Sequence, residues 1–192
     1  MEKIHILTAI LITGSPGVGK TTLVRKICSK LGEQRKLQGF YTEEVRTAGK
    51  GQRIGFDVVT LSGKRGILAR EGPLDNLRRP KVGKYSVYVQ DFEDLTLPLL
   101  LEGSQSGCEL LVIDEVGKME LLSKRFEAAM ASVLQQQRLL LATIPQSNRQ
   151  SLPLVERLKS LPGVVIYEVT KGNRDALVNE ITECIIQSKL LA

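Results

Sequence analysis

Residues 14–21 read Gly-Ser-Pro-Gly-Val-Gly-Lys-Thr and match the pattern GxxxxGK[ST] at every fixed position. The motif follows an apolar run, 4–12, and precedes a stretch with apolar residues at helical spacing, 20–31. Glycines let the backbone curl so that several N–H groups point inward, and the start of a following helix adds partial positive charge there. The context therefore predicts a strand, a phosphate-binding loop of the Walker A type and a helix.

Two side chains of this loop are candidates for chemistry. Lys20 is expected to bridge β- and γ-phosphate oxygens of a nucleotide, which gives it a catalytic role. The hydroxyl of Thr21 is a candidate Mg²⁺ ligand. The nucleotide-binding residues expected here are Gly14, Ser15, Pro16, Gly17, Val18, Gly19, Lys20, Thr21 and Thr22.

A second motif, Leu-Leu-Val-Ile-Asp-Glu at 110–115, is an apolar run that ends in two acids and resembles a Walker B strand. Acids at the carboxyl end of a buried parallel strand face the crevice where open α/β sheets bind ligands. Asp114 is therefore predicted to hold Mg²⁺ through its water shell, and Glu115 to orient or deprotonate the attacking water. Lys118 is either a phosphate contact or a solvated lysine, and Thr143 either senses the γ-phosphate or is satisfied locally.

The turn after the last predicted strand, Thr-Lys-Gly-Asn-Arg-Asp at 170–175, echoes the guanine-reading pattern [Asn/Thr]-Lys-x-Asp. Asn173 stands where that pattern has Asp. An Asp accepts two hydrogen bonds from guanine, whereas Asn accepts one and must donate the other. We therefore predict base contact with weak discrimination, by Asn173 and Arg174. Capping of the following helix by Thr170 or Asn173 is compatible with this role.

Strand-like and helix-like patterns alternate along the chain, which predicts an α/β fold with a mainly parallel sheet flanked by helices. Two runs rich in aromatic and β-branched residues, 39–46 and 53–61, predict an antiparallel hairpin added to that sheet. We expect residues 1–192 to form one domain, within which 39–89 is a β-rich insertion. Segment 62–84, with seven basic residues, is expected to be the least regular part.

Capping residues and prolines predict where the helices begin and where they are interrupted. Asp91 is predicted to cap a helix that starts at Phe92, and Pro98 to kink or shorten it. Ser123 is predicted to cap a helix with apolar residues at i, i+3, i+4, i+7 and i+8. The other expected elements are strands at 85–89, 109–115, 138–144 and 164–169 and helices at 151–161 and 174–188.

Composition narrows the class and the setting of the protein. The 192 residues are 42% hydrophobic and 25% charged, which excludes a disordered, collagen-like or coiled-coil protein. The net charge of +6 favours anionic partners such as nucleotides, nucleic acid or an acidic membrane face, and does not choose among them. Three widely spaced cysteines fit a reducing cytoplasmic, or alternatively nuclear, setting. No stretch approaches the ~18–20 apolar residues of a membrane span, so no membrane partner is expected.

With these residues in view, the chain resembles the cancer-related nucleoside-triphosphatase family, small P-loop enzymes found from thermophilic prokaryotes to animals. The resemblance covers nearly the whole chain and rests on 14–22, 112–120, Asn173-Arg174 and two more specific segments, Gly39–Arg46 and Arg53–Leu61. It implies a RecA-like P-loop fold. It also implies slow, Mg²⁺-dependent hydrolysis of ATP, GTP, CTP and UTP to diphosphate and phosphate, in which Lys20, Thr21, Asp114 and Glu115 keep the roles given above.

Two other functions remain open from the sequence. A kinase for a nucleotide or another small molecule would use Glu115 on an acceptor hydroxyl, and a GTPase-like switch would use Asp-Glu-Val-Gly at 114–117 as its DxxG motif. No recognised nucleic-acid-reading motif is present, so we expect no nucleic-acid partner, and we expect a monomer.

Arginines and hairpin acids are the remaining candidates for the site. An arginine that reaches the γ-phosphate can be worth 10³–10⁵ in rate. The expected in-chain candidates are Arg65, Arg70, Arg78 and Arg79. The hairpin residues expected to approach the site are Glu43, Glu44, Arg46 and Arg53.

Overall fold

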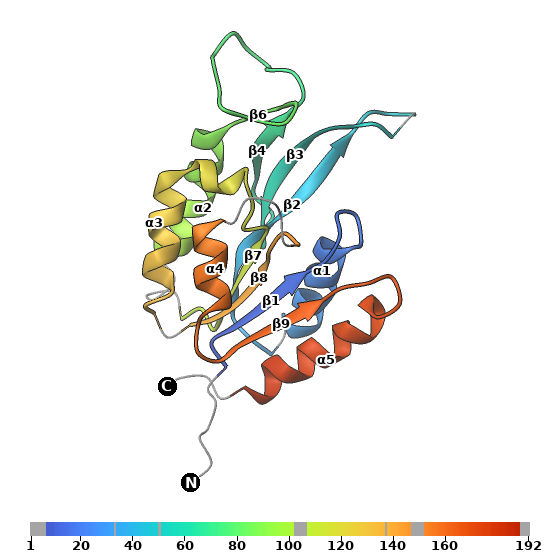
Figure 1. Ribbon diagram of the computed structural model, residues 1–192, viewed down its shortest axis with the longest axis vertical. Coiled ribbons are helices and arrows are strands. Elements are labelled where there is room, and N and C mark those ends of the chain that lie inside the picture. The colour runs from blue at the N-terminus through green and yellow to red at the C-terminus, as the bar shows by residue number, and fades with distance from the viewer. Residues whose placement is uncertain are drawn as a thin grey trace.

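The computed structural model describes residues 7–32, 34–49, 51–101, 107–136, 138–146 and 152–188. Within these residues nine strands form one sheet, in the order β5-β6-β4-β3-β2-β7-β8-β1-β9 (Figure 1). The strands are β1 (Ala9–Thr13), β2 (Leu37–Arg46), β3 (Arg53–Thr60), β4 (Arg65–Arg70), β5 (Lys81–Val82), β6 (Tyr85–Val87), β7 (Leu110–Asp114), β8 (Leu139–Thr143) and β9 (Val164–Glu168). The helices are α1 (Lys20–Leu31), α2 (Val89–Leu101), α3 (Lys124–Val133), α4 (Pro153–Lys159) and α5 (Arg174–Gln187), with a 3₁₀ turn at Glu120–Leu122.

The sheet has a parallel half and an antiparallel half. Strands β2, β7, β8, β1 and β9 pair in parallel, whereas β3, β4, β6 and β5 continue the sheet from β2 in antiparallel pairs. In the parallel half, β8 separates the strand that precedes the phosphate loop from the strand that ends in two acids. This is the RecA-like arrangement expected from the sequence. The antiparallel hairpin is confirmed, but only its second strand, β3, is added to the parallel sheet, because β2 itself pairs in parallel with β7.

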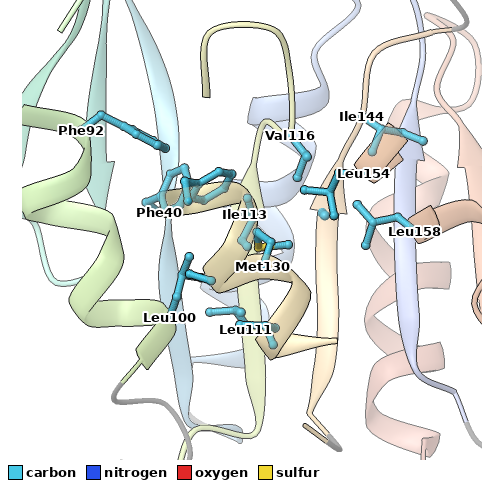
Figure 2. Packing of buried hydrophobic residues seen from close by; sticks show 14 of the residues in the cluster. Phe40, Phe92, Leu100, Leu111, Ile113, Val116, Met130, Ile144, Leu154 and Leu158 are labelled. Atoms are coloured by element: carbon cyan, nitrogen blue, oxygen red, sulfur yellow. The ribbon is translucent and has the colours of Figure 1, made fainter. Parts of the chain in front are cut away.

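Helices cover both faces of the parallel strands (Figure 1). Ile10 and Ile12 of β1 belong to a buried cluster with residues of α1 and α5. The alternate residues Ala9 and Leu11 belong to a second cluster with residues of α2, α3 and α4. Strand side chains alternate between faces, so a continuous apolar run is what a doubly covered strand requires. Figure 2 shows the second cluster, in which Phe40 of β2 packs edge-on to other aromatic rings.

Several predicted boundaries are confirmed. Helix α1 spans residues 20–31 as expected, and β2 and β3 form the predicted hairpin. Ser123 caps α3, because its hydroxyl oxygen accepts a hydrogen bond from the backbone N–H of Phe126 at 2.9 Å. Strand β1 begins at Ala9, and residues 4–6 of the expected run lie outside the described residues.

The prediction of an irregular segment 62–84 is wrong in part, because it contains β4 and β5. Leu68 and Ala69 of β4 are fully buried in the second cluster. The flanking charges of Arg65 and Arg70 both pair with Asp57 on the neighbouring strand. Two of the seven basic residues of this segment are thus paired with a carboxylate across the sheet.

The prediction that a helix starts at Phe92 is also wrong, and Pro98 does not shorten that helix. The helix begins at Val89, so Asp91 lies in its first turn, where a negative charge interacts favourably with the helix dipole. The helix also continues through Pro98 to Leu101. Pro98 and Asp94 are both exposed, so the Asp94 carbonyl that loses its helical partner is on the face open to water. None of the helices in the described part of the chain is long and apolar enough to cross a membrane.

Candidate active site

The phosphate loop has the backbone that its glycines predict. Gly14, Gly17 and Gly19 have φ angles of 149°, 76° and 108°, a region that other residues rarely adopt. Gly14 is also constrained by packing, because a Cβ there would lie 2.6 Å from the carbonyl oxygen of Val169. Helix α1 begins directly after this turn, at Lys20. The loop therefore presents its backbone N–H groups and a helix N-terminus to one place.

The two candidate side chains of the loop, Lys20 and Thr21, line the same pocket. Lys20 is half-buried, and its Nζ donates a hydrogen bond to the carbonyl oxygen of Gly14 at 3.1 Å, which folds the lysine over its own loop. Thr21 and Thr22 line the same pocket as Lys20. Ser15 donates a hydrogen bond to Gln146 at 3.1 Å. Val18 faces the interior and packs in the α1–α5 cluster.

Asp114 lies at the end of β7 and is 1% exposed. One carboxylate oxygen, Oδ1, accepts a hydrogen bond from the hydroxyl of Thr143 on the adjacent strand β8. Burial raises the pKa of Asp114, and the hydroxyls of Thr143 and Thr21 and the charge of Lys20 oppose the rise. Because the Thr143 hydroxyl is used on Asp114, the local role is favoured for Thr143 over sensing of a γ-phosphate.

Glu115 follows Asp114 and lines the pocket. Burial raises its pKa, Lys20 lowers it, and the negative charge of Asp114 raises it further. A carboxyl group with a raised pKa is better matched to accepting a proton near neutral pH. Asp114 is buried and Glu115 lines the pocket. These positions are consistent with the predicted roles, in which Asp114 holds Mg²⁺ and Glu115 acts on the attacking water.

A third acid, Glu120, belongs to the site and was missed by sequence reasoning. Its Oε2 accepts a hydrogen bond from the N–H of Gly117 at 3.0 Å. A Cβ on Gly117 would lie 2.8 Å from Glu115 Oε1 and 3.0 Å from Glu120 Oε2, so the two carboxyl groups flank this glycine. Burial and the charge of Glu115 raise the pKa of Glu120 to about 8. Only the 3₁₀ turn brings Glu120 back to the strand end, and nothing in the motif signals that turn.

These groups open into a pocket of about 820 Å³ that joins the phosphate loop to the β2–β3 hairpin. The hairpin residues expected near the site, Glu43, Glu44, Arg46 and Arg53, all line it. Exposed Lys118 lines it as well, which keeps open its role as a phosphate contact. The lining residues that sequence reasoning did not find are Thr42, Phe56, Leu68, Val82, Met119, Glu120, Pro145 and Gln146.

The arginines proposed from the sequence to reach a γ-phosphate lie elsewhere. Arg65 pairs with Glu43 and Asp57, and Arg79 pairs with Asp75. Arg70 pairs with the same Asp57, and none of these three or Arg78 is among the described residues that line the pocket. The arginines that do line it are Arg46 and Arg53. The expectation therefore fails for all four candidates, because charge alone does not show which strand edge faces the pocket.

The turn predicted to contact the base lies beside the phosphate loop. Arg174 Nη1 lies 3.5 Å from the carbonyl oxygen of Val18, next to Gly19. The amide of Asn173 accepts a hydrogen bond from the Thr170 N–H at 2.8 Å and donates one to the Glu168 carbonyl at 2.9 Å. Asn173 thus braces its own turn and makes no side-chain cap bond to α5.

The donor set fits Mg²⁺. Asp114 Oδ2 is buried and has no hydrogen-bond partner among the described residues, and the Thr21 hydroxyl is close enough to lower the pKa of that carboxyl. In the described residues no three His, Cys, Asp or Glu side chains cluster to hold a metal by themselves. Mg²⁺ characteristically binds one or two protein ligands and takes its remaining oxygens from water and substrate phosphates.

Comparison with known proteins agrees with this geometry. The sequence model of a family described as NTPase matches residues 9–182. The chain belongs to this NTPase family. It is 47% identical over 173 residues to nucleoside-triphosphatase THEP1 of Thermotoga petrophila, covering 90% of this chain and 89% of that protein. It is 44% identical over 187 residues to human cancer-related nucleoside-triphosphatase, covering 94% and 97%.

Two solved structures of NTPase-family proteins share the fold. The crystal structure of THEP1 from Aquifex aeolicus superposes with a TM-score of 0.79 at 37% identity, covering 93% of this chain and 99% of that one. The solution structure of human cancer-related nucleoside triphosphatase gives a TM-score of 0.80 at 43% identity, covering 95% and 99%. The P-loop fold and the family resemblance expected from the sequence are confirmed.

Proposed function

We propose that this NTPase-family protein is a Mg²⁺-dependent hydrolase of ATP, GTP, CTP and UTP that works slowly and with little base preference. Hydrolysis of nucleoside triphosphates follows from membership of the family. The observation that carries the rest is that Lys20, Thr21 and Glu115 line one pocket, while the buried carboxyl of Asp114 lies close enough to Thr21 and Lys20 for both to lower its pKa.

The side chains divide the reaction between them. The Lys20 ammonium exchanges its bond to Gly14 for the β- and γ-phosphate oxygens and stabilises their charge. Thr21 and Asp114 would hold Mg²⁺, which supplies charge neutralisation when bound. Glu115 orients a water and accepts its proton as the water oxygen bonds to the γ-phosphorus. The bond from the γ-phosphorus to the bridging oxygen breaks, and the diphosphate leaves.

The position of the arginines supports slow turnover. Tyr41 of β2 is level with Asp114, and Arg46 lies five residues further along the strand. Arg53 is opposite Arg46 on the neighbouring strand β3, so it is equally far from Asp114 along the sheet. By strand register neither of these two pocket-lining arginines lies level with Asp114, and an enzyme with no arginine on the γ-phosphate forgoes a factor of about 10³–10⁵.

The turn at 170–175 supports tolerance of the base. Both ends of the Asn173 amide are used inside the turn, which leaves one donor and one acceptor of the amide for a base instead of two of each. A site reads a base strongly only when it leaves unpaired groups for that base to satisfy. We infer that the four nucleotides are bound with similar affinity.

The cysteines indicate the compartment in which the protein acts. Cys28, Cys108 and Cys184 are unpaired in the structure, which fits a reducing compartment, and we infer a cytoplasmic location. We also infer a monomer, with nucleoside triphosphates as its partners. Light scattering of the purified chain would test the assembly, and a doubled mass would refute it.

The function is tested by phosphate release from the four triphosphates with Mg²⁺ and no acceptor, for the intact chain, for Glu115→Gln and for Glu127→Gln. Glu127 is a matched control, since it lies on α3 outside the pocket and pairs with Lys124. We expect rates within tenfold of one another for the four bases, no change in Glu127→Gln, and a loss of about 100-fold or more in Glu115→Gln, in the usual range for a general base.

Four results would contradict the proposal. Unchanged hydrolysis by Glu115→Gln would remove Glu115 from the water. A hundredfold preference for one base would refute the tolerance argued from Asn173. Tight nucleotide binding without phosphate release would favour a kinase that requires an acceptor, and release that persists after Mg²⁺ is chelated would refute the metal dependence.

A further inference from the structure

The pocket continues past the phosphate loop along one face of the β2–β3 hairpin, which extends beyond the ends of the parallel strands (Figure 1). Thr42, Glu44 and Arg46 alternate along β2 and therefore share a face. On β3, Phe56 pairs with Glu44 and Arg53 with Arg46. We call the part of the pocket lined by Glu44, Arg46, Arg53, Phe56, Leu68 and Val82 the outer compartment.

The outer compartment lies beyond the reach of the triphosphate. Tyr41 pairs with Asp114, and Arg46 follows five residues later, about 17 Å further at the usual strand rise. A γ-phosphate held by Lys20 lies beside Asp114, at the near end of this distance. The far end of the pocket is therefore not filled by the phosphates.

The nucleoside also leaves the outer compartment free. The turn proposed to contact the base packs against Val18 and Gly19, and no residue from 170 to 175 is among the described residues that line the pocket. The nucleoside thus leaves the loop on the side away from the hairpin. This step rests on the proposed function. The volume of about 820 Å³ belongs to the whole pocket, and the outer compartment is the part of it that the phosphates at Lys20 do not fill.

The rim of the outer compartment is positively charged and held in place. The Glu44 carboxylate pairs with both Arg46 and Arg53, so two cations face one anion. Arg53 is fixed further, because its Nε donates a hydrogen bond to the Tyr85 hydroxyl at 3.1 Å and its guanidinium lies 5.1 Å from the Phe56 ring centre. A fixed guanidinium with net positive surroundings binds phosphate oxygens at a low cost in ordering.

The floor of the outer compartment is apolar. Phe56, Leu68 and Val82 line it beside the charged rim and also pack against the α2–α4 cluster. A flat ring placed against Phe56 would bury apolar surface and stack, while an attached phosphate reaches the arginines. The two features together select a ligand that has both a ring and an oxyanion.

We propose that the outer compartment binds a second small molecule, an organic phosphate that carries a flat ring and is about the size of a nucleoside monophosphate. It binds while the phosphate loop holds a nucleoside triphosphate. Arg46 and Arg53 contact its phosphate, and Phe56 contacts its ring.

The test is a calorimetric titration of AMP, GMP, CMP and UMP into protein saturated with Mg²⁺ and a β,γ-imido triphosphate, which is not hydrolysed. The variants are Arg53→Gln and the matched control Arg79→Gln. Arg79 likewise pairs with a carboxylate, Asp75, and lies 4.0 Å from the Tyr88 ring centre, but it is outside the pocket. Ribose 5-phosphate is the probe without a ring.

We expect one equivalent of monophosphate to bind the saturated wild type and Arg79→Gln with equal affinity, and Arg53→Gln at least tenfold more weakly. Ribose 5-phosphate should bind at least tenfold more weakly than the monophosphates. Thermal unfolding checks that Arg53→Gln is folded, and Arg46→Gln replaces it if it is not.

The titration can contradict the inference in several ways. Absence of monophosphate binding to the saturated protein, or equal affinity in the wild type and Arg53→Gln, would overturn the inference. Displacement of the imido triphosphate by the monophosphate would place it at the phosphate loop instead. Since the titration requires no hydrolysis, it is independent of the rate measured above. Failure of the imido triphosphate itself to bind would overturn the proposed function and this inference with it.

Discussion

Glu120 is a buried acid whose protonation links the site to stability. Burial and Glu115 raise its pKa to about 8, against an ordinary value of 4.5. Between these values the folded chain keeps a proton that the unfolded chain releases, so the free energy of unfolding falls as the pH rises from about 4.5 to about 8 and levels off above. Glu120→Gln keeps an acceptor for the Gly117 N–H and cannot ionise.

We therefore expect Glu120→Gln to raise the free energy of unfolding at pH 8.5 by roughly 1–3 kcal/mol and to change it little at pH 5. The measurement is urea unfolding at both pH values, without Mg²⁺ or nucleotide. An equal effect at the two pH values would show that the folded acid titrates normally.

Gly39 is a position of β2 at which no side chain fits against β7. Its φ angle is 136°, and a Cβ there would lie 1.8 Å from the carbonyl oxygen of Val112, its partner on β7. We expect Gly39→Ala to destabilise the fold by about 3 kcal/mol or more, because both backbone strands must shift. Gly72→Ala is the control, since nothing lies within 4 Å of a Cβ there and it should change stability by under about 0.5 kcal/mol. Chemical unfolding measures both, and equal effects would refute the close approach.

Site residues could be predicted from the sequence where a short motif sets their geometry. Lys20, Thr21, Asp114 and Glu115 each lie within a few residues of a recognisable loop or strand end. Arg53 was expected near the site, but its orientation could not be predicted, because it depends on the register of β2 with β3 and on a hydrogen bond to Tyr85, 32 residues away. Register and distant contacts are set by tertiary packing, which one sequence does not display.

Helix α3 begins at a cap that also joins two helices. The Ser123 hydroxyl accepts from the Phe126 N–H and donates to Glu93 of α2 at 2.6 Å, in a buried position. We expect Ser123→Ala to lower the free energy of unfolding by roughly 1–3 kcal/mol, since it removes the cap and leaves a buried carboxylate short of a donor.

The control for Ser123→Ala is Ser132→Ala on the same helix, where an exposed hydroxyl bonds only to the Ala128 carbonyl, at 3.4 Å. Thermal and urea unfolding give both values. If the two substitutions cost the same, the Ser123–Glu93 bond contributes nothing beyond helix propensity.

Elements were predicted well where their patterns are local. The cap and spacing of α3 lie in neighbouring residues, and both were visible. Strand β4 was not, because its charged ends, Arg65 and Arg70, are paired with Asp57 on β3 and only that pairing makes them compatible with a sheet. The effect of Pro98 was also predicted wrongly. How much a proline destabilises a helix depends on whether the carbonyl that loses its partner faces water, which the sequence does not show.

At the scale of the whole molecule, the β-rich insertion and the parallel sheet share one core. Leu68 and Val87 from the insertion belong to the same buried cluster as Leu111 and Ala142 of the parallel strands. The order of the strands could not be read from the sequence, because which strands become neighbours is decided by packing between distant segments. A shared core has a measurable consequence, since a part that buries its surface only against the rest cannot unfold alone.

We therefore expect one cooperative unfolding transition. Three of the four tyrosines, Tyr41, Tyr85 and Tyr88, lie in the insertion and the chain has no tryptophan, so tyrosine fluorescence reports on the insertion while far-ultraviolet dichroism reports on the helices. The two signals should change together. Leu68→Ala, at a position 1% exposed, should lower both midpoints through a loss of about 2–5 kcal/mol, whereas Leu77→Ala, at a position 67% exposed, should shift neither. If the tyrosine signal changed at a lower temperature than the dichroism, the insertion would be a separate folding unit, because its apolar face would then not depend on the parallel sheet.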